Sequence, residues 1–144
     1  MKADQQTEEQ VIAAVKAGLN AYSAMDLEGV LAQYEEGPDM VVVGAGPGME
    51  YFGVEAMREA VLNDFDHQSH AGLKASRFRI SREGDVAWCF ARINAFAGRD
   101  GIPSMVGGRL TAVLVYKQGK WPIAQSHISF PRHKQESGIE PTDL

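Results

Sequence analysis

The sequence predicts one α+β domain, in which helices pack on a strongly curved, mostly antiparallel sheet and close a cone with an internal pocket. Apolar residues recur at helical spacing in the first half of the chain and alternate along long segments of the second half. A length of 144 residues suits one domain. Helices followed by strands on short turns are typical of α+β folds.

Three helices are expected before residue 67. The first starts after the candidate N-cap Thr7, whose hydroxyl can bond a free N–H group of the first turn. The second is short and starts at Asp26. The third runs from about Val54 to Asp66, with Met57, Val61 and Leu62 facing inward. The inward faces of the first two helices are expected to carry Val11, Ile12, Val15, Leu19, Tyr22, Leu27, Val30, Leu31 and Tyr34.

Two short strands are expected between the second and third helices. Met40–Val43 is a β-branched run typical of a buried strand, and Tyr51–Phe52 is a second candidate. The glycine-rich segment Gly44–Gly48 lies between them. Met49 stands where a dinucleotide-binding fingerprint needs its third glycine, so this segment is interpreted as a turn.

Four long strands are expected after residue 72. Glycine-containing turns join them, so consecutive strands must be antiparallel. Gly107-Gly108 predicts a bulge or bend inside the third of these strands. The strands are Leu73–Ser81, Val86–Ala97, Ser104–Lys117 and Trp121–Phe130, and the turns are Glu83-Gly84-Asp85, Arg99-Asp100-Gly101 and Gln118-Gly119-Lys120.

Composition sets the organisation and excludes several classes of protein. Residues 1–6 form a polar N-terminal segment, 7–131 the domain and 132–144 a polar tail. The net charge is −5, with an acidic first half and a basic second half, so a nucleic-acid partner is not expected. The first ten residues lack the features of a signal peptide and no run suits a membrane span, which predicts a cytoplasmic protein without a membrane partner. The lone Cys89 is interpreted as a buried, inert thiol.

The order of elements, read with particular residues, resembles the nuclear transport factor 2-like superfamily, which has a cystatin-like α+β fold, and within it the SnoaL-like family. The most specific segment is Arg109–Ser129, which contains the pattern Trp-x-Ile-x-x-x-His-x-Ser from Trp121 onward. The last strands are also similar to the association domain of calcium/calmodulin-dependent kinase. The resemblance implies the fold, whereas the superfamily includes isomerases, cyclases, dehydratases, binding modules and assembly domains.

Alternation on the last strands supplies the candidate site. His127 and Gln125 share one face of the last strand, and Arg109 lies on the strand before it; if these faces look into the cone, they form its polar floor. Histidine suits acid–base catalysis, so His127 is the candidate catalytic residue, and arginine suits a carboxylate. The candidate ligand-binding residues are Tyr22, Tyr34, Arg92, Asn94, Arg109, Gln125 and His127.

Each of these candidates has a structural alternative. His127 could be hydrogen-bonded within the fold, and Arg109 could lie at a sheet edge or an interface. Trp88 and Phe90 fit a dimer interface as well as a pocket. Alternation alone does not say which face of the Val86–Ala97 strand looks inward, because a slip of one residue reverses the assignment.

The position of acidic residues bears on mechanism. Cyclases and isomerases of the superfamily use a pocket carboxylate as base, yet no Asp or Glu occurs between Gly101 and Gln135. A carboxylate base must therefore come from the first half, for instance Asp39 or Glu50. No metal or other cofactor is expected, since His67 and His70 have no acidic or cysteine partner at ligand spacing.

Three functions remain open at this point. The first is a small-molecule-binding protein whose pocket takes a partly apolar or carboxylate-bearing ligand, with an anion favoured by the basic last strands. The second is a SnoaL-like isomerase, cyclase or hydrolyase that uses His127 or a first-half acid as base. The third is an assembly module. A homodimer formed through the sheet is expected in each case.

Overall fold

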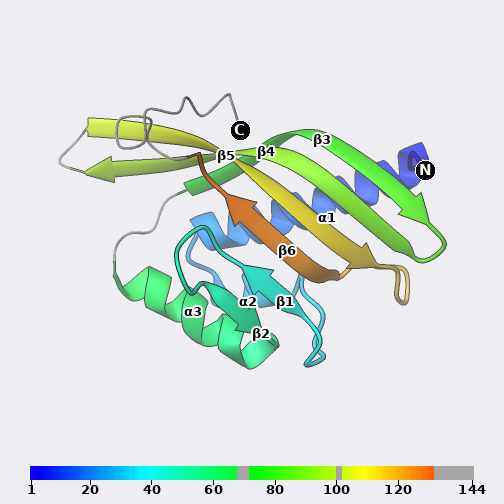
Figure 1. Ribbon diagram of the computed structural model, residues 1–144, viewed down its shortest axis with the longest axis horizontal. Coiled ribbons are helices and arrows are strands. Elements are labelled where there is room, and N and C mark those ends of the chain that lie inside the picture. Colours follow the sequence, from blue (N-terminus) through cyan, green and yellow to red (C-terminus); the bar gives the residue numbers. More distant parts are fainter. Residues whose placement is uncertain (68–71, 100–101, 132–144) are drawn as a thin grey trace.

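Helix α1 (Gln5–Ser23) crosses one face of a six-stranded sheet, and the two shorter helices lie beside its C-terminal end (Figure 1). The structure is a computed structural model that describes residues 1–67, 72–99 and 102–131, without the side chains of 97–99 and 102–104. The other elements are α2 (Leu27–Leu31), β1 (Val41–Val43), β2 (Glu50–Phe52), α3 (Val54–Asp66), β3 (Gly72–Glu83), β4 (Val86–Arg99), β5 (Ile102–Val115) and β6 (Ile123–Ser129).

The sheet confirms the predicted fold class. Its strand order is β2-β1-β6-β5-β4-β3, and it is open at both edges. Strand β1 runs parallel to β6, whereas every other neighbouring pair is antiparallel. The long strands β3, β4 and β5 follow one another through hairpins, and the short strands β1 and β2 extend the sheet beyond β6 (Figure 1).

The start of α1 differs from the sequence prediction. Its N-cap is Asp4, whose carboxylate accepts a hydrogen bond from the backbone N–H of Thr7 at 2.7 Å. Thr7 is instead buried inside the first turn, where its hydroxyl accepts from the Arg82 guanidinium at 2.8 Å. The residues before the helix also pair with the sheet, since Ala3 donates its N–H to the Ile80 carbonyl. The predicted start of the second helix at Asp26 is confirmed, since Asp26 is the N-cap of α2 and its carboxylate accepts from the Gly29 N–H at 3.0 Å.

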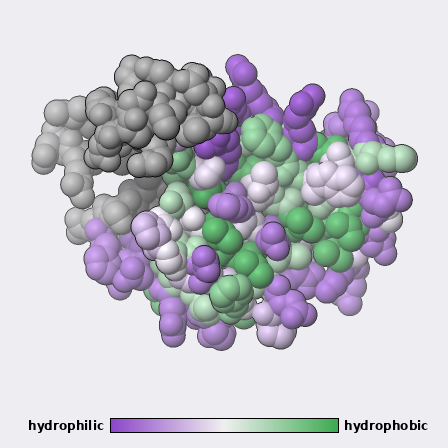
Figure 2. Space-filling model, in the orientation of Figure 1, coloured by the Kyte–Doolittle hydropathy of each residue, from purple (hydrophilic) through white to green (hydrophobic). Residues whose placement is uncertain are grey.

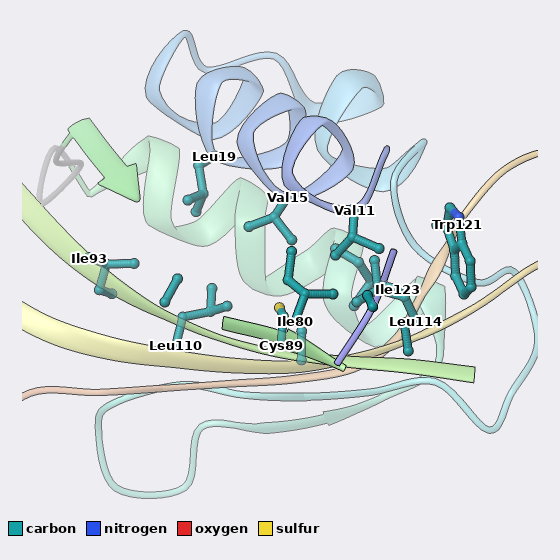
Figure 3. Close-up of a cluster of buried hydrophobic side chains, with 14 residues drawn as sticks. Val11, Val15, Leu19, Ile80, Cys89, Ile93, Leu110, Leu114, Trp121 and Ile123 are labelled. Carbon is teal, nitrogen blue, oxygen red and sulfur yellow. The ribbon is translucent and has the colours of Figure 1, made fainter. Parts of the chain in front are cut away.

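The main core lies between α1 and the sheet. Val11, Val15 and Leu19 project from one side of α1 toward the strands, as their spacing predicts (Figure 3). Leu114 on β5 is completely buried beneath them. A second cluster joins α2, α3 and the segment before β1, and its buried members are Val30, Leu31, Met40, Met57, Val61 and Phe65.

The turns agree with the sequence where the structure describes them. Gly84 and Gly119 both take the positive φ expected at the β3–β4 and β5–β6 turns. The remaining predicted turn joins β4 and β5, and its residues Asp100-Gly101 lie outside the described residues. The predicted tail 132–144 also lies outside them. Of the bulge or bend predicted at Gly107-Gly108, the bulge is wrong, because β4 and β5 stay in continuous register through both glycines, and the bend stays a prediction.

Gly108 has a packing role instead. A Cβ atom at this position would lie 2.5 Å from Cδ1 of Phe130 and 2.6 Å from the Ser129 carbonyl oxygen. Phe130 therefore packs against the bare backbone of β5. The register shifts of the sheet occur elsewhere, between Ser76 and Arg79 and between Val113 and Leu114.

One end of the α1–sheet sandwich is closed by aromatic stacking. The Arg82 guanidinium lies 4.9 Å from the centroid of the Trp121 ring and 5.6 Å from that of Tyr116. The Trp121 indole N–H donates to the Gln10 amide oxygen at 3.0 Å. A cation–π cluster and a hydrogen bond thus close the end of the sandwich where α1 begins.

Candidate functional site

A cavity of about 280 Å³ lies at the end of the sandwich where α1 finishes. It is bounded by the C-terminal half of α1, by α2 and α3, by the β1–β2 turn and by the helix-facing side of the sheet. Its lining residues are Val15, Gly18, Leu19, Tyr22, Val30, Tyr34, Val42, Val43, Gly44, Ala45, Met49, Tyr51, Met57, Ala60, Val61, Asp64, Leu73, Ala95, Leu110, Ala112, Ile123, Ser126, Ile128 and Phe130.

Small residues on three sides of this cavity leave the space open. Gly18 on α1 and Ala60 on α3 face it from the helices, and Ala95 and Ala112 face it from β4 and β5. Larger side chains at these positions would occupy the volume, as Leu114 and Ile80 do in the main core. The pocket expected in the cone is therefore present, and it is predominantly apolar.

The first polar group in the pocket is a tyrosine–carboxylate pair. The Tyr22 hydroxyl, at the end of α1, donates to Oδ2 of Asp64 on α3 at 3.0 Å. Burial, followed by the neighbouring Asp64 charge, raises the pKa of Tyr22 above its ordinary value. Tyr22 therefore keeps its proton and holds the Asp64 carboxyl group at the pocket wall.

The second polar group in the pocket is a pair of hydroxyls. Tyr34, which follows α2, shares a hydrogen bond of 3.0 Å between its hydroxyl and that of Ser126 on β6. Burial raises the pKa of Tyr34, so this phenol also remains protonated. One hydroxyl of the pair donates to the other, which leaves one hydroxyl hydrogen available to a ligand.

The other predicted site residues lie on the opposite face of the sheet. Buried Ala112 and Leu114 point toward α1, so their neighbours on β5 point away, and Arg109 is on that outer face together with exposed His127 of β6. The expectation that these side chains form the floor of the pocket is therefore wrong. The residues concerned are Arg92, Asn94, Arg109, Gln125 and His127, none of which lines the cavity.

These outer-face residues still lie near one another. Arg92 and Arg109 are directly paired across β4 and β5, and Thr111 is paired with His127 across β5 and β6. A shallow groove of about 340 Å³ crosses this face, and its lining includes Arg79, Trp88 and His127. A role for the five residues in ligand binding thus remains a prediction, and it now concerns a surface separate from the apolar pocket.

Asp64 and Ser126 are two polar pocket residues that sequence reasoning missed. Asp64 follows Met57 and Val61 at helical spacing, so the pattern already placed it on the inward face of α3. Leu62 was expected there on hydropathy, but it is 43 % exposed. The first-half acids named as candidate bases, Asp39 and Glu50, are both exposed and neither lines the pocket.

The remaining motifs carry no site chemistry in the described residues. The Gly44–Gly48 segment forms the β1–β2 turn, as predicted, and folds around Met49, whose sulfur accepts from the Gly46 N–H. Exposed His67 contacts the Asn63 carbonyl, and His70 lies outside the described residues. Burial raises the pKa of the Cys89 thiol to about 11, which agrees with an inert cysteine.

Two absences follow for residues 1–67, 72–99 and 102–131. No group of three or more His, Cys, Asp or Glu side chains is arranged to hold a metal ion there. Among the helices described, none is long and apolar enough to cross a membrane.

Solved structures with similar folds come from several bacteria. A protein from Novosphingobium aromaticivorans, provisionally described as an aromatic ring hydroxylase, is 23 % identical with a TM-score of 0.80, over 92 % of this chain and 94 % of that one. A nuclear transport factor 2-like superfamily protein from Salmonella enterica is 17 % identical with a TM-score of 0.78, over 96 % and 100 %. At these identities the likeness shows the fold alone.

The resemblance to the kinase association domain is also found in three dimensions. A Xanthomonas campestris protein, provisionally described as a calcium/calmodulin-dependent protein kinase II association domain, is 19 % identical with a TM-score of 0.71, over 90 % of this chain and 93 % of that one. No curated protein matches the sequence significantly. The model of the SnoaL-like domain matches residues 11–133, which is most of the chain. The chain therefore belongs to the SnoaL-like family.

Proposed function

We propose that this protein binds a small, predominantly apolar molecule in the pocket between α1, α3 and the sheet. One observation carries the proposal: a cavity of about 280 Å³ persists beneath the helices, although the rest of the sandwich is filled by side chains. An enclosed apolar cavity with a few polar groups is the usual form of a small-molecule site. The ligand gains affinity by removing its apolar surface from water.

The test uses 2-methylnaphthalene, a rigid apolar probe, and a variant that fills the cavity. Ala60 lines the pocket from α3, so Ala60→Phe places a ring in the space that the probe needs. Glu59→Phe is the matched control, because Glu59 is the exposed neighbour on the same helix.

Calorimetric titration should show binding to the wild type and to Glu59→Phe, and at least about a tenfold loss in Ala60→Phe. Circular dichroism establishes that each variant is folded, and Ala60→Leu serves as a milder substitution. Equal affinity in all variants, or no binding to the wild type, would refute the pocket as the ligand site.

An acid–base enzyme is the second candidate, and it is favoured by the acidic group inside the pocket. Asp64 replaces His127 as the candidate base, since it lines the cavity while His127 does not. A carboxylate next to a bound ketone can remove an α-proton, and the one hydroxyl hydrogen that the Tyr34–Ser126 pair leaves available can be donated to the ketone oxygen.

Proton exchange of 2-tetralone in D₂O tests this candidate by NMR. An enzyme should accelerate the loss of the α-proton signal above the buffer rate, and Asp64→Asn should abolish that acceleration. Asp66→Asn, an exposed position two residues along α3, is the control and should exchange as the wild type does. Exchange at the buffer rate with wild-type protein would count against a base in the pocket.

A homodimer formed through the sheet is proposed from the composition of the outer face. Trp88 and Phe96 of β4 are 43 % and 39 % exposed, and Met105 of β5 is 62 % exposed. Apolar surface also emerges between polar groups in the space-filling view (Figure 2). Aromatic residues, Met and Arg are enriched in protein interfaces, so Arg92 and Arg109 suit this role too.

Sedimentation equilibrium of the wild type and of Trp88→Glu tests the dimer. The wild type should sediment at twice the mass of one chain, and the variant should shift toward the monomer because a carboxylate is introduced into the interface. Glu83→Gln, at the end of β3, is a conservative control. A monomeric wild type would exclude both the dimer and an assembly function.

A further inference from the structure

The pocket carries charge of a single sign. Asp64 is the only ionisable acid or base other than tyrosine among its described lining residues. The arginines and the histidine that suggested an anionic ligand are on the other face of the sheet. The expectation of a carboxylate-bearing ligand therefore has no cation in the pocket to support it.

The hydrogen bonds already made by Asp64 indicate which ligand groups can bind to it. Tyr22 donates its hydroxyl proton to one carboxylate oxygen, and its raised pKa means that this proton is retained. A carboxylate has two oxygens and accepts several hydrogen bonds, so the second oxygen can receive a donor from a ligand. In apolar surroundings such a charge-assisted bond is stronger than a neutral one.

The same geometry disfavours an anion. A second carboxylate would enter an apolar cavity that already holds an acidic side chain, and both would lose hydration without a positive partner. A hydroxyl or a protonated amine is favoured instead, because it can donate a hydrogen bond to the Asp64 carboxylate. The Tyr34–Ser126 pair is uncharged, so it does not change the preference for a donor over an anion.

We propose that the pocket selects ligands in which a hydrocarbon body carries a hydrogen-bond-donating group, either a hydroxyl or a protonated amine, that binds Asp64. Tyr22 is a positioning residue for that carboxylate. Ligands whose polar group is a carboxylate are excluded. The inference rests on the proposed binding function, because it assigns the chemical class of ligand for the same pocket.

Four probes that share a naphthalene body test the selection at neutral pH. They are naphthalen-2-ylmethylamine, which is cationic, naphthalen-2-ylmethanol, which is a neutral donor, 2-methylnaphthalene, which has no polar group, and 2-naphthoate, which is an anion. Calorimetric titration should rank at least one of the two donors about tenfold or more above 2-methylnaphthalene, with 2-naphthoate weakest. The order of the amine and the alcohol distinguishes a cationic from a neutral ligand.

Two variants assign the preference to the proposed residues. Asp64→Asn keeps the size of the side chain and removes its charge, so the preference of the wild type for its better donor over 2-methylnaphthalene should fall at least about tenfold. Tyr22→Phe should weaken the same preference by a smaller factor, because the carboxylate remains but loses its positioning bond. Asp66→Asn, on the exposed side of α3, should behave as the wild type.

The outcomes separate the two proposals. If no member of the series binds, the proposed function fails and the selection fails with it. If 2-methylnaphthalene binds but the donors gain nothing, if 2-naphthoate binds best, or if Asp64→Asn leaves the ranking unchanged, the selection is overturned while the apolar pocket stands. Undiminished binding of 2-methylnaphthalene to Asp64→Asn shows that the variant is folded with an intact pocket.

Discussion

The two faces of β4 differ in the size of their side chains. The helix-facing residues Ala87 and Ala91 are small and fully buried, whereas Trp88 and Arg92 on the outer face are large and exposed. Ala87 and Ala91 belong to the buried cluster that also contains Val11 and Val15 of α1, whereas none of the described helices lies over the outer face. The comparison teaches that the larger, more aromatic face of a strand is not necessarily the face that binds a ligand.

The same difference accounts for the pocket. Toward the closed end, Ile80, Leu114 and Trp121 fill the space beneath α1. Toward the other end, the small residues Ala95 and Ala112 on the sheet and Gly18 and Ala60 on the helices line a space that stays open. A cavity therefore remains at the C-terminal end of α1, on the face of the sheet opposite to Arg92 and Arg109.

The largest expected effect comes from adjacent residues on opposite faces of β5. Leu114→Ala should lower the free energy of unfolding by about 2–5 kcal/mol, because a completely buried side chain is replaced by a cavity. Val113→Ala, one residue earlier on the outer face, should cost about 1 kcal/mol or less. Urea denaturation measures both. Equal losses would mean that the assignment of the two faces is wrong.

A second pair of neighbours tests the close approach beside the pocket. Gly108→Ala should destabilise the protein by about 1–3 kcal/mol, since the added methyl group collides with Phe130 and with the Ser129 carbonyl. Gly107→Ala is the control, because its methyl group would meet nothing closer than 3.6 Å. Alanine is less destabilising than glycine inside a strand, so Gly107→Ala should not lower the free energy of unfolding.

Because Phe130 lines the pocket, Gly108→Ala should also weaken the binding of 2-methylnaphthalene. The test compares the two glycine variants by denaturation and by titration. A stable Gly108→Ala variant with normal binding would contradict the packing described for this end of the sheet.

A smaller effect is expected from alkaline pH. The pKa of Tyr22 is raised above its ordinary value of 10.0, so the folded protein keeps a proton that the unfolded chain releases above pH 10. This contribution to stability is complete below pH 10 and is lost as the pH rises toward the folded-state pKa, with a slope of at most about 1.4 kcal/mol per pH unit.

Tyr22→Phe removes the titrating group, so its free energy of unfolding should fall less steeply between pH 9.5 and pH 11 than that of the wild type. Urea denaturation at several pH values measures the two slopes. Parallel curves would show that the Tyr22 hydroxyl is not held in the pocket as described.

Much of the fold could be predicted from the sequence. The spacing of apolar residues predicted the helices and the long strands, and the glycines at residues 84 and 119 predicted the hairpin turns that join them. These features could be predicted because they depend on local geometry. The start of α1 was missed, since both Asp4 and Thr7 are plausible caps and the choice depends on the tertiary bond between Thr7 and Arg82.

The site was predicted only in part. Tyr22 and Tyr34 were expected in the pocket from helical spacing, and both line it. His127 and Arg109 were assigned to the wrong face, because alternation gives two faces without saying which one the helices cover. Asp64 was missed, since an acid on an otherwise apolar helix face has the same pattern as a solvated residue until its partner Tyr22 is known.

The most direct test of the account is a crystal structure of the protein grown with naphthalen-2-ylmethanol. The account predicts density for the naphthalene rings between α1, α3 and the inner face of the sheet, with the alcohol oxygen within hydrogen-bond distance of the Asp64 carboxylate. Density on the outer face beside His127 and Arg109, with the inner cavity occupied only by protein side chains, would contradict it.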